Sequence, residues 1–584
     1  MPVTNDMILH LEQMKSFYRG LTSGELYPRW EEDTNRGFGA PTTSYYPPGV
    51  YYLTSALYAV SGDWMLVVLA TYFLMMAASG AAMYVFVRRF LSQPAAATAM
   101  VCYIFLPYHL LDQYQRGALA ECLSFVFMPL MLMFAESLLA DRAKTRAGFE
   151  AAHSYPPPGS RAESRKLLNI VFLSLTIGAF LWCHPPTAYQ FMLAFGLFVV
   201  LSAVIRKSWK GLVAVMIAGF LGLCVSGAYL YPASVEQDLI RHEFVSTTWP
   251  YHTTYLFAHG TTYDLVAFAW IFNAFTIVIG AVTLLFVEPG LIKPNSGLRQ
   301  RIWLWLIVGC YASFMITPAS FFVGRLIPKI EIGVFAWRML GITTLFAALI
   351  AGACAQAAFN ARQQPKQPKR NSLSSLATVT IVAGAFFVGF RIVAGVYGSP
   401  PFVVADEHTN LAMMPKSGPV EPLELPGVER AELSSAQGSV QVEDWRPQHR
   451  TMNVELNTPD KLLIRTFNFP GWQATVDGEA VPIQSGDALR IELSNSEKVL
   501  IRAATFRGAT PIVDGRPGKI IGTEPLGDIE IQLNSGTHRV SLDYVLTPSR
   551  RVGVLISWCS LVLVLGLLLV STTIRLRSSR KLTA

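Results

Sequence analysis

A carboxylate and an imidazole stand four residues apart near the start of the chain. Asp6 and His10 belong to residues 5–20, a stretch that suits a helix. The i, i+4 spacing places both side chains on one helix face. A carboxylate beside an imidazole is suited to general-base chemistry, in which a proton is removed from an attacking group. A structural alternative stays open, because aspartate is a common helix N-cap and His10 would then be a solvated side chain.

Three arginines are candidates for binding an anionic group. Arg116 and Arg338 lie at the ends of apolar runs, and Arg29 lies in the N-terminal segment. A guanidinium matches phosphate through two parallel hydrogen bonds. An arginine at the edge of a membrane span also contacts lipid headgroups, so a purely interfacial role stays open. Glu121 follows Arg116 by five residues and is expected to pair with it as a structural bridge.

Few other residues point to chemistry. The 7 cysteines lie within or at the edge of apolar runs and form no CxxC pair, which disfavours disulfides and a zinc site. The chain has no P-loop, Rossmann fingerprint or HExxH motif. We expect no cofactor, although a divalent cation stays open for a group of acidic and histidine residues whose spacing matches no known motif. These residues are Glu236, Asp238, His242, Glu243, His252, His259 and Asp264.

Long apolar runs dominate the chain and must position these groups. Of 584 residues, 52% are hydrophobic and only 15% are charged, whereas a soluble chain carries roughly 25% charge. Eleven runs are long enough to span a membrane, so we predict a polytopic α-helical membrane protein. The runs are 64–88, 94–111, 118–139, 167–183, 187–205, 211–231, 263–288, 302–317, 335–359, 373–393 and 551–573.

The basic residues predict how the chain crosses the membrane. The net charge of +8 does not indicate nucleic acid, because Lys and Arg gather in every second connection between apolar runs. The positive-inside rule places these loops in the cytoplasm. Residues 1–46, 232–262 and 396–548 are then expected outside. Because residues 1–17 contain no signal-peptide core, we also expect a first membrane helix upstream of Met1 in the full gene.

Residues 396–548 have a different character from the apolar runs. They are polar, rich in Pro and Gly, and contain short β-prone stretches such as Lys461–Phe467 and His538–Val545. Asp477-Gly478 between apolar stretches predicts a type I′ hairpin. We predict an extracytoplasmic β-sandwich here. The expected organisation is an outer loop with interfacial helices (1–63), a transmembrane bundle (64–395), the β-rich domain (396–548), and a final helix with a basic tail (549–584).

Several short motifs occur in an order that resembles one family. The outer segment has D-x3-H at Asp6, G-x-x-Y-P-R-W ending at Trp30, N-x-G-x-G-x-P from Asn35, and Y-Y-P-P-G-V-Y-Y from Tyr45 to Tyr52. We expect the run after the first helix to be a loop that lies on the membrane, because its Tyr and Trp side chains, Trp30 and Tyr51 among them, suit the headgroup zone. Further motifs are R-x-A-x-x-E from Arg116 to Glu121, Cys183-His184-Pro185, Phe335-Ala336-Trp337-Arg338 and Phe469-Pro470-Gly471-Trp472. Together they resemble bacterial GT-C-type membrane glycosyltransferases, in particular the "6-pyruvoyl-tetrahydropterin synthase-related" membrane proteins with kinship to YfhO-like proteins.

The resemblance implies a fold and an activity. It implies a GT-C-like bundle that transfers a sugar, with inversion, from a polyprenyl-phosphate donor to a cell-envelope glycan, lipid or protein. The reaction would take place on the outer side of the cytoplasmic (inner) membrane, among membrane lipids. By carry-over, Asp6 with His10 forms the catalytic pair. Arg116, Arg338 and Arg29 bind the donor phosphate, and Glu121 and Trp337 support them.

Two functions of other classes stay open. A transporter or flippase for lipid-linked glycans would predict inverted repeats and charged, broken mid-membrane helices. We find no repeat in the sequence, and the charges lie at the ends of the apolar runs. A non-catalytic assembly factor would use the β-rich domain to hold a partner, and it would tolerate loss of the Asp6 carboxylate.

Overall fold

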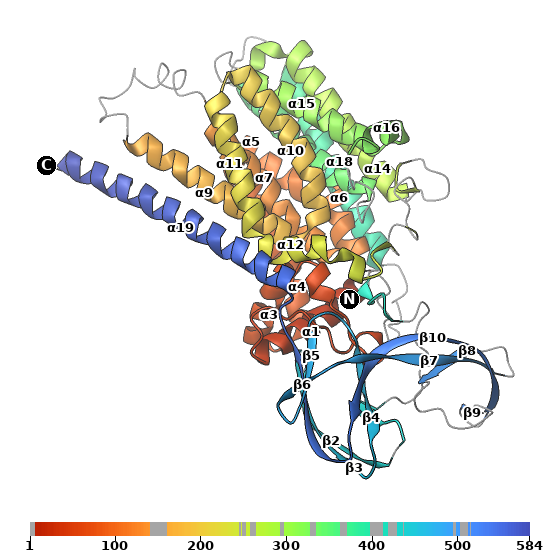
Figure 1. Cartoon of the computed structure of the whole chain (residues 1–584). Coiled ribbons are helices and arrows are strands. Elements are labelled where there is room, and N and C mark those ends of the chain that lie inside the picture. Colours follow the sequence, from red (N-terminus) through yellow and green to blue (C-terminus); the bar gives the residue numbers. More distant parts are fainter. Residues whose placement is uncertain are drawn as a thin grey trace.

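The protein consists of a helical bundle, an N-terminal segment and a β-domain, as the computed structural model shows (Figure 1). The structure describes residues 6–140, 160–243, 247, 253–256, 264–292, 297–327, 335–362, 371–397, 413–418, 429–435, 437–493, 498–502, 512–513 and 516–583. In Figure 1 the β-domain lies below the bundle, and the red N-terminal helices lie between the two.

Eight helices of the described chain are long and apolar enough to cross a membrane, and the number rises to 11 if each of three bent pairs is one span. The unbent helices are α4 (Trp64–Val87), α7 (Leu119–Leu139), α9 (Ser160–Cys183), α10 (Pro185–Arg206), α14 (Asp264–Val282, continued by η5, Thr283–Val287), α17 (Met339–Arg362), α18 (Asn371–Tyr397) and α19 (Pro548–Thr583). Each of the predicted apolar runs coincides with one of these helices or with a bent pair. The prediction of a polytopic helical membrane protein is therefore confirmed.

The three bends have local causes. The first joins α5 (Gln93–Phe105) to α6 (Pro107–Leu110) and η2 (Leu111–Arg116) at 45°, and the third joins α15 (Leu298–Met315) to η8 (Pro318–Ser320) and α16 (Phe321–Gly324) at 94°. In both pairs the second helix begins at a proline, which cannot continue the preceding helix. The second, between α11 (Trp209–Val225) and α12 (Gly227–Val235), bends by 73°. There α19 packs so closely that a Cβ on Gly227 would lie 2.9 Å from Ile556.

The basic ends of the helices meet at the end of the bundle away from the β-domain. Glu136, near the end of α7, accepts hydrogen bonds from Arg301 at 3.1 and 3.2 Å and lies 3.5 Å from Arg206. Arg206 ends α10 and Arg301 lies in the first turn of α15. Residues of α7, α10 and α15 thus come together at one point of the bundle.

The β-domain is built from two antiparallel sheets. Their orders are β1-β4-β10-β7-β8, with β9 paired to β10, and β2-β3-β11-β5-β6. The strands are β1 (Ala431–Leu433), β2 (Gly438–Arg446), β3 (His449–Leu456), β4 (Asp460–Phe467), β5 (Trp472–Val476), β6 (Glu479–Val481), β7 (Gln484–Leu493), β8 (Lys498–Arg502), β9 (Ile512–Val513), β10 (Arg516–Leu533) and β11 (Gly536–Tyr544). One apolar core is shared by Ile464 and Ile529 of the first sheet and Val454 and Leu542 of the second. This is the arrangement of a β-sandwich.

The predicted hairpin joins β5 to β6. Val476 pairs with Glu479, so Asp477 and Gly478 form a two-residue loop. Both have positive φ, 53° and 88°, which a type I′ turn requires and which Asp-Gly adopts readily.

The N-terminal segment packs into the protein rather than lying on the lipid surface. Trp30 is only 2% exposed and belongs to the core of the β-domain, 5.2 Å from the ring of Trp472. Tyr51, on α3 (Gly49–Ser61), is fully buried against α1 (Met7–Thr22). Placing the aromatic residues of this segment in the headgroup zone was therefore wrong for these two side chains, because tertiary packing buries their apolar surface.

The final helix fastens the β-domain to the bundle. Glu236, just after α12, accepts hydrogen bonds from Thr547 and Ser549 and lies 3.3 Å from the Arg550 guanidinium. Arg550 donates in turn to Tyr544, the last residue of β11, at 2.7 Å. The end of the β-domain and the start of α19 are thus held to one point of the bundle.

Candidate functional site

A buried carboxylate with two arginines lies at the end of the bundle that faces the β-domain. Glu121, in the first turn of α7, accepts hydrogen bonds from Arg116 Nη1 at 3.0 Å and from Arg338 Nε at 3.1 Å. Its other oxygen accepts from the Tyr108 hydroxyl at 2.8 Å. Arg338 ends the short helix η9 (Ala336–Arg338) before α17. The expected Glu121–Arg116 pair is present, and it includes a second arginine from a distant part of the chain.

Arg116 is held by a further carboxylate, Asp112. Arg116 Nη1 lies 2.5 Å from Asp112 Oδ1, and Asp112 is fully buried in the π-helical turn η2. The backbone reverses directly after Arg116 at Gly117, whose φ is 68°. A left-handed residue of this kind is easily formed by glycine. This turn aims Arg116 back over its own helix and toward α7.

Asp6 lies at the open side of this cluster. Its backbone N–H donates to the Arg116 carbonyl at 3.0 Å, and Oδ2 lies 3.9 Å from Arg116 Nη2. The Asp6 side chain makes no hydrogen bond that caps α1, and it is 44% exposed. Asp6 thus occupies the N-cap position of α1, but its side chain does not cap the helix. The cluster holds a carboxylate in place through the backbone while leaving its oxygens open to an incoming group.

The charges of the cluster limit what it can bind. Three carboxylates (Asp6, Asp112 and Glu121) and two arginines (Arg116 and Arg338) give 2 − 3 = −1 when all are ionised. Arg116 already serves all three carboxylates. Arg338 contributes a second guanidinium to the cluster through its contact with Glu121.

His10 is buried next to Asp6 rather than solvated. It is 4% exposed, and its backbone N–H donates to the Asp6 carbonyl at 3.0 Å. Nδ1 lies 3.0 Å from the hydroxyl of Tyr51, and the ring stands edge-on to Tyr46 at 5.8 Å. Burial lowers the pKa of His10 to about 4. The ring is therefore neutral at pH 7, and it is a weaker base than an exposed imidazole.

The other two predicted residues lie in different surroundings. Arg29 donates to the Tyr544 carbonyl at 3.4 Å and stacks over the ring of that residue, at the contact between the N-terminal segment and the β-domain. These contacts lie outside the cluster around Glu121. Trp337 stacks on Phe335 with ring centroids 4.5 Å apart, and so shapes the loop that carries Arg338.

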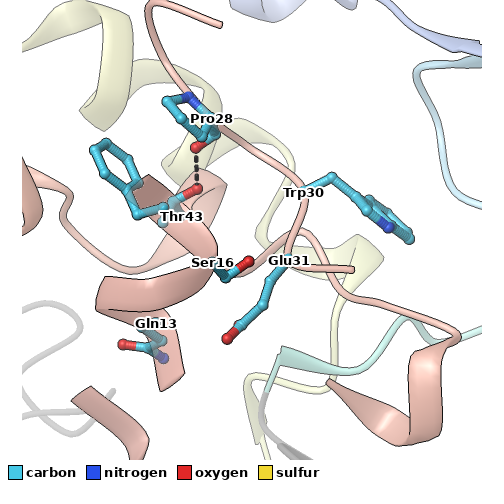
Figure 2. A pocket seen from close by; sticks show the side chains of 7 residues that line it. Gln13, Ser16, Pro28, Trp30, Glu31 and Thr43 are labelled. Atoms are coloured by element: carbon cyan, nitrogen blue, oxygen red, sulfur yellow. Dashed lines mark hydrogen bonds between the residues drawn. The ribbon is translucent and has the colours of Figure 1, made fainter. Parts of the chain in front are cut away.

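A small cavity lies between α1 and the segment that follows it. It is lined by Gln13, Ser16, Phe17, Pro28, Trp30, Glu31 and Thr43 (Figure 2). Its volume of ≈ 10 Å³ is enough for about one water molecule. Glu31 points into it, and burial raises the pKa of this carboxyl to about 7. A proton thus stays on Glu31 where an exposed glutamate would have lost it.

We expect Glu31→Gln to stabilise the protein at pH 8 and not at pH 4. Since the pKa is raised from 4.5 to about 7 on folding, wild type loses stability as pH rises through this window, by up to about 3 kcal/mol. Glutamine is neutral throughout and avoids this loss. Unfolding of both proteins in detergent across pH 4–8 measures the difference. The same change at the exposed Glu479 serves as control, and a difference for Glu31→Gln that does not vary with pH would contradict the expectation.

One residue of the acidic group considered for a divalent cation takes part in contacts within the protein. Glu236 is engaged by Thr547, Ser549 and Arg550. In the part of the chain that the structure describes, no three His, Cys, Asp or Glu side chains are grouped so as to hold a metal ion. His252 and His259 lie outside the described residues.

Sequence reasoning missed Asp112, Tyr51 and Gln13. Asp112 could have been found from its i, i+4 spacing to Arg116. Tyr51 and Gln13 gave no signal of this kind, because 38 residues separate them and only the packing of α3 on α1 brings them together.

Comparison with known proteins adds little. No model of a known protein family matches the chain, and no curated protein matches it either. One solved structure with a similar arrangement is the archaeal oligosaccharyltransferase AglB from Archaeoglobus fulgidus, in complex with an inhibitory peptide and a dolichol-phosphate. The TM-score is 0.40 at 10% sequence identity, over 66% of this chain and 51% of AglB, so the chain spans about half the length of AglB. A likeness this slight assigns no activity, and the function is therefore derived from the residues of the site.

Proposed function

We propose that the protein is an inverting glycosyltransferase of the GT-C type. It transfers a sugar from a polyprenyl-phosphate donor to a cell-envelope glycan, lipid or protein, on the outer side of the cytoplasmic membrane. The observation that carries this proposal is the half-exposed carboxylate of Asp6, held beside two arginines where the membrane bundle meets the β-domain.

The reaction uses these groups in one displacement. Asp6 accepts the proton of an acceptor hydroxyl, whose oxygen forms a bond to the anomeric carbon of the sugar. The bond from that carbon to the phosphate oxygen breaks, and its electron pair leaves with the lipid phosphate. Attack opposite to the leaving group inverts the anomeric centre. Asp6 is suited to this role because its carboxylate is exposed and fixed through its backbone.

We assign the leaving phosphate to Arg116 and Arg338, the two arginines of the cluster. Both guanidinium groups contact Glu121. A guanidinium next to the departing phosphate stabilises the charge that develops there. Arg116 also positions Asp6, whose backbone N–H donates to the Arg116 carbonyl. Arg29 supports the docking of the β-domain.

A transfer assay with purified protein in lipid vesicles tests the proposal. A panel of radiolabelled polyprenyl-phosphate sugars is supplied together with envelope extracts. The assay measures how much labelled sugar moves from the lipid phosphate to an acceptor in the extract. We expect transfer with at least one donor, with inverted configuration at the anomeric carbon and none with heat-denatured protein. Movement of the intact donor across the bilayer without cleavage of the sugar–phosphate bond would favour a flippase instead.

A further inference from the structure

The buried hydrogen bonds behind α1 fix which nitrogen of His10 carries its proton. Tyr51 has one hydroxyl proton, and its hydroxyl donates to Gln13 Oε1. The same oxygen lies 3.0 Å from His10 Nδ1. Because the proton of Tyr51 is already used, the bond to His10 requires Nδ1–H as the donor. Nε2 is then the unprotonated nitrogen.

The orientation of the Gln13 amide follows from the cavity that it lines with Glu31. With Oε1 turned to Tyr51, the amide NH₂ faces this cavity (Figure 2). A carboxylate accepts hydrogen bonds and does not donate them. The oxygens of Glu31, which lines the same cavity, suit the amide orientation in which NH₂ faces the cavity and Oε1 accepts from Tyr51.

Neutral His10 lies near the carboxylate of Asp6 without a direct hydrogen bond to it. They are one helical turn apart, and Asp6 is the first charged group that acts on the imidazole, followed by Arg116. No hydrogen bond or ion pair joins the two side chains. Tyr46 borders His10, and the charges that act on Tyr46 are those of the cluster: Asp6, Arg338, Glu121 and Arg116. His10 is thus one helical turn from Asp6 and next to a tyrosine on which the charges of the cluster act.

We propose that Tyr51 and Gln13 are positioning residues that hold His10 in the Nδ1–H form, so that Nε2 presents a second hydrogen-bond acceptor beside Asp6. Two neighbouring acceptors, one charged and one neutral, suit an acceptor molecule with two adjacent hydrogen-bond donors, as in the vicinal hydroxyls of a sugar. One hydroxyl loses its proton to Asp6 and attacks. The other donates to His10 Nε2 and orients the molecule. This consequence for the acceptor rests on the proposed function, whereas the tautomer does not.

The tautomer can be measured directly on the full protein in lipid. Solid-state NMR of ¹⁵N-histidine-labelled protein distinguishes protonated from unprotonated ring nitrogens, and a His10→Gln sample identifies the His10 signals. We expect protonated Nδ1 and unprotonated Nε2 at pH 7 in wild type. Protonated Nε2 in wild type would overturn the proposal.

Two variants separate the roles of the positioning residues. Gln13→Leu removes the acceptor of the Tyr51 proton, so Tyr51 is free to donate to His10 Nδ1 and the proton of His10 moves to Nε2. Tyr51→Phe keeps the ring that packs on Phe17 and Tyr46 but removes the hydroxyl, so the preference for Nδ1–H is lost. Tyr52→Phe is the matched control, because the Tyr52 hydroxyl donates to the Leu26 carbonyl and does not contact His10. A wild-type His10 spectrum in Gln13→Leu would contradict the proposed hydrogen-bond chain.

Transfer measurements on the same samples connect the tautomer to function. With a saccharide acceptor, Tyr51→Phe is expected to lower kcat about three- to tenfold, the effect of one neutral hydrogen bond, while Tyr52→Phe keeps the wild-type rate. If wild type shows the expected NMR signals but no transfer, the proposed function fails and the tautomer assignment stands. If transfer occurs with Nε2 protonated, the function stands and this inference fails.

Discussion

Replacing Asp6 with asparagine is expected to lower sugar transfer by about 10²- to 10⁴-fold, the range that a positioned general base contributes. Asparagine has nearly the same shape as aspartate but accepts no proton from the attacking hydroxyl. The backbone bond from residue 6 to the Arg116 carbonyl does not depend on the side chain. The Asp6 side chain caps no helix and is half exposed, so we expect the variant to fold as wild type does.

Asp33→Asn is a suitable control for this experiment. Asp33 is also an exposed aspartate of the N-terminal segment, and its partner is Arg19 rather than the cluster. We expect Asp33→Asn to transfer sugar at the wild-type rate. Unfolding temperatures of the three proteins show whether a lost activity reflects lost chemistry. Wild-type transfer by Asp6→Asn would place the base elsewhere. The assembly-factor hypothesis would be favoured if wild type transferred no sugar and Asp6→Asn kept the function of the protein in cells.

Replacing Glu121 with alanine is expected to destabilise the protein by about 3–5 kcal/mol, the cost of removing one partner from a buried ion pair. Glu121 is 2% exposed and receives hydrogen bonds from Arg116, Arg338 and Tyr108. Alanine leaves these donors without their common acceptor and leaves the cationic charge of Arg338 buried. Chemical or thermal unfolding in detergent measures the loss.

Two further variants test whether the charge is the cause. Tyr108→Phe removes one neutral donor to Glu121 and should cost only about 1 kcal/mol. Combining Glu121→Leu with Arg338→Met removes both charges, and the double variant should be more stable than the sum of the two single effects predicts. Additive effects in this cycle would contradict a direct Glu121–Arg338 interaction.

The sequence was sufficient for features that depend on neighbouring residues. A run of about 20 apolar residues cannot leave its backbone groups unpaired in lipid, so it forms a helix whatever surrounds it. The spans could therefore be predicted from composition. The Asp477-Gly478 turn was predictable because its two positive φ values are a local requirement. The i, i+4 relation of Asp6 and His10 likewise follows from the helix α1 alone.

The tertiary structure alone decided what those residues do. Arg338 is 217 residues from Glu121, and no local rule relates them. Burial turned His10 from an expected solvated or basic group into a neutral one, because desolvation depends on what packs against the ring. Trp30 entered the core of a domain that begins some 400 residues later. Packing, charge compensation and buried hydrogen-bond direction are properties of residues brought together from distant parts of the chain, whereas helix and turn formation are properties of adjacent ones.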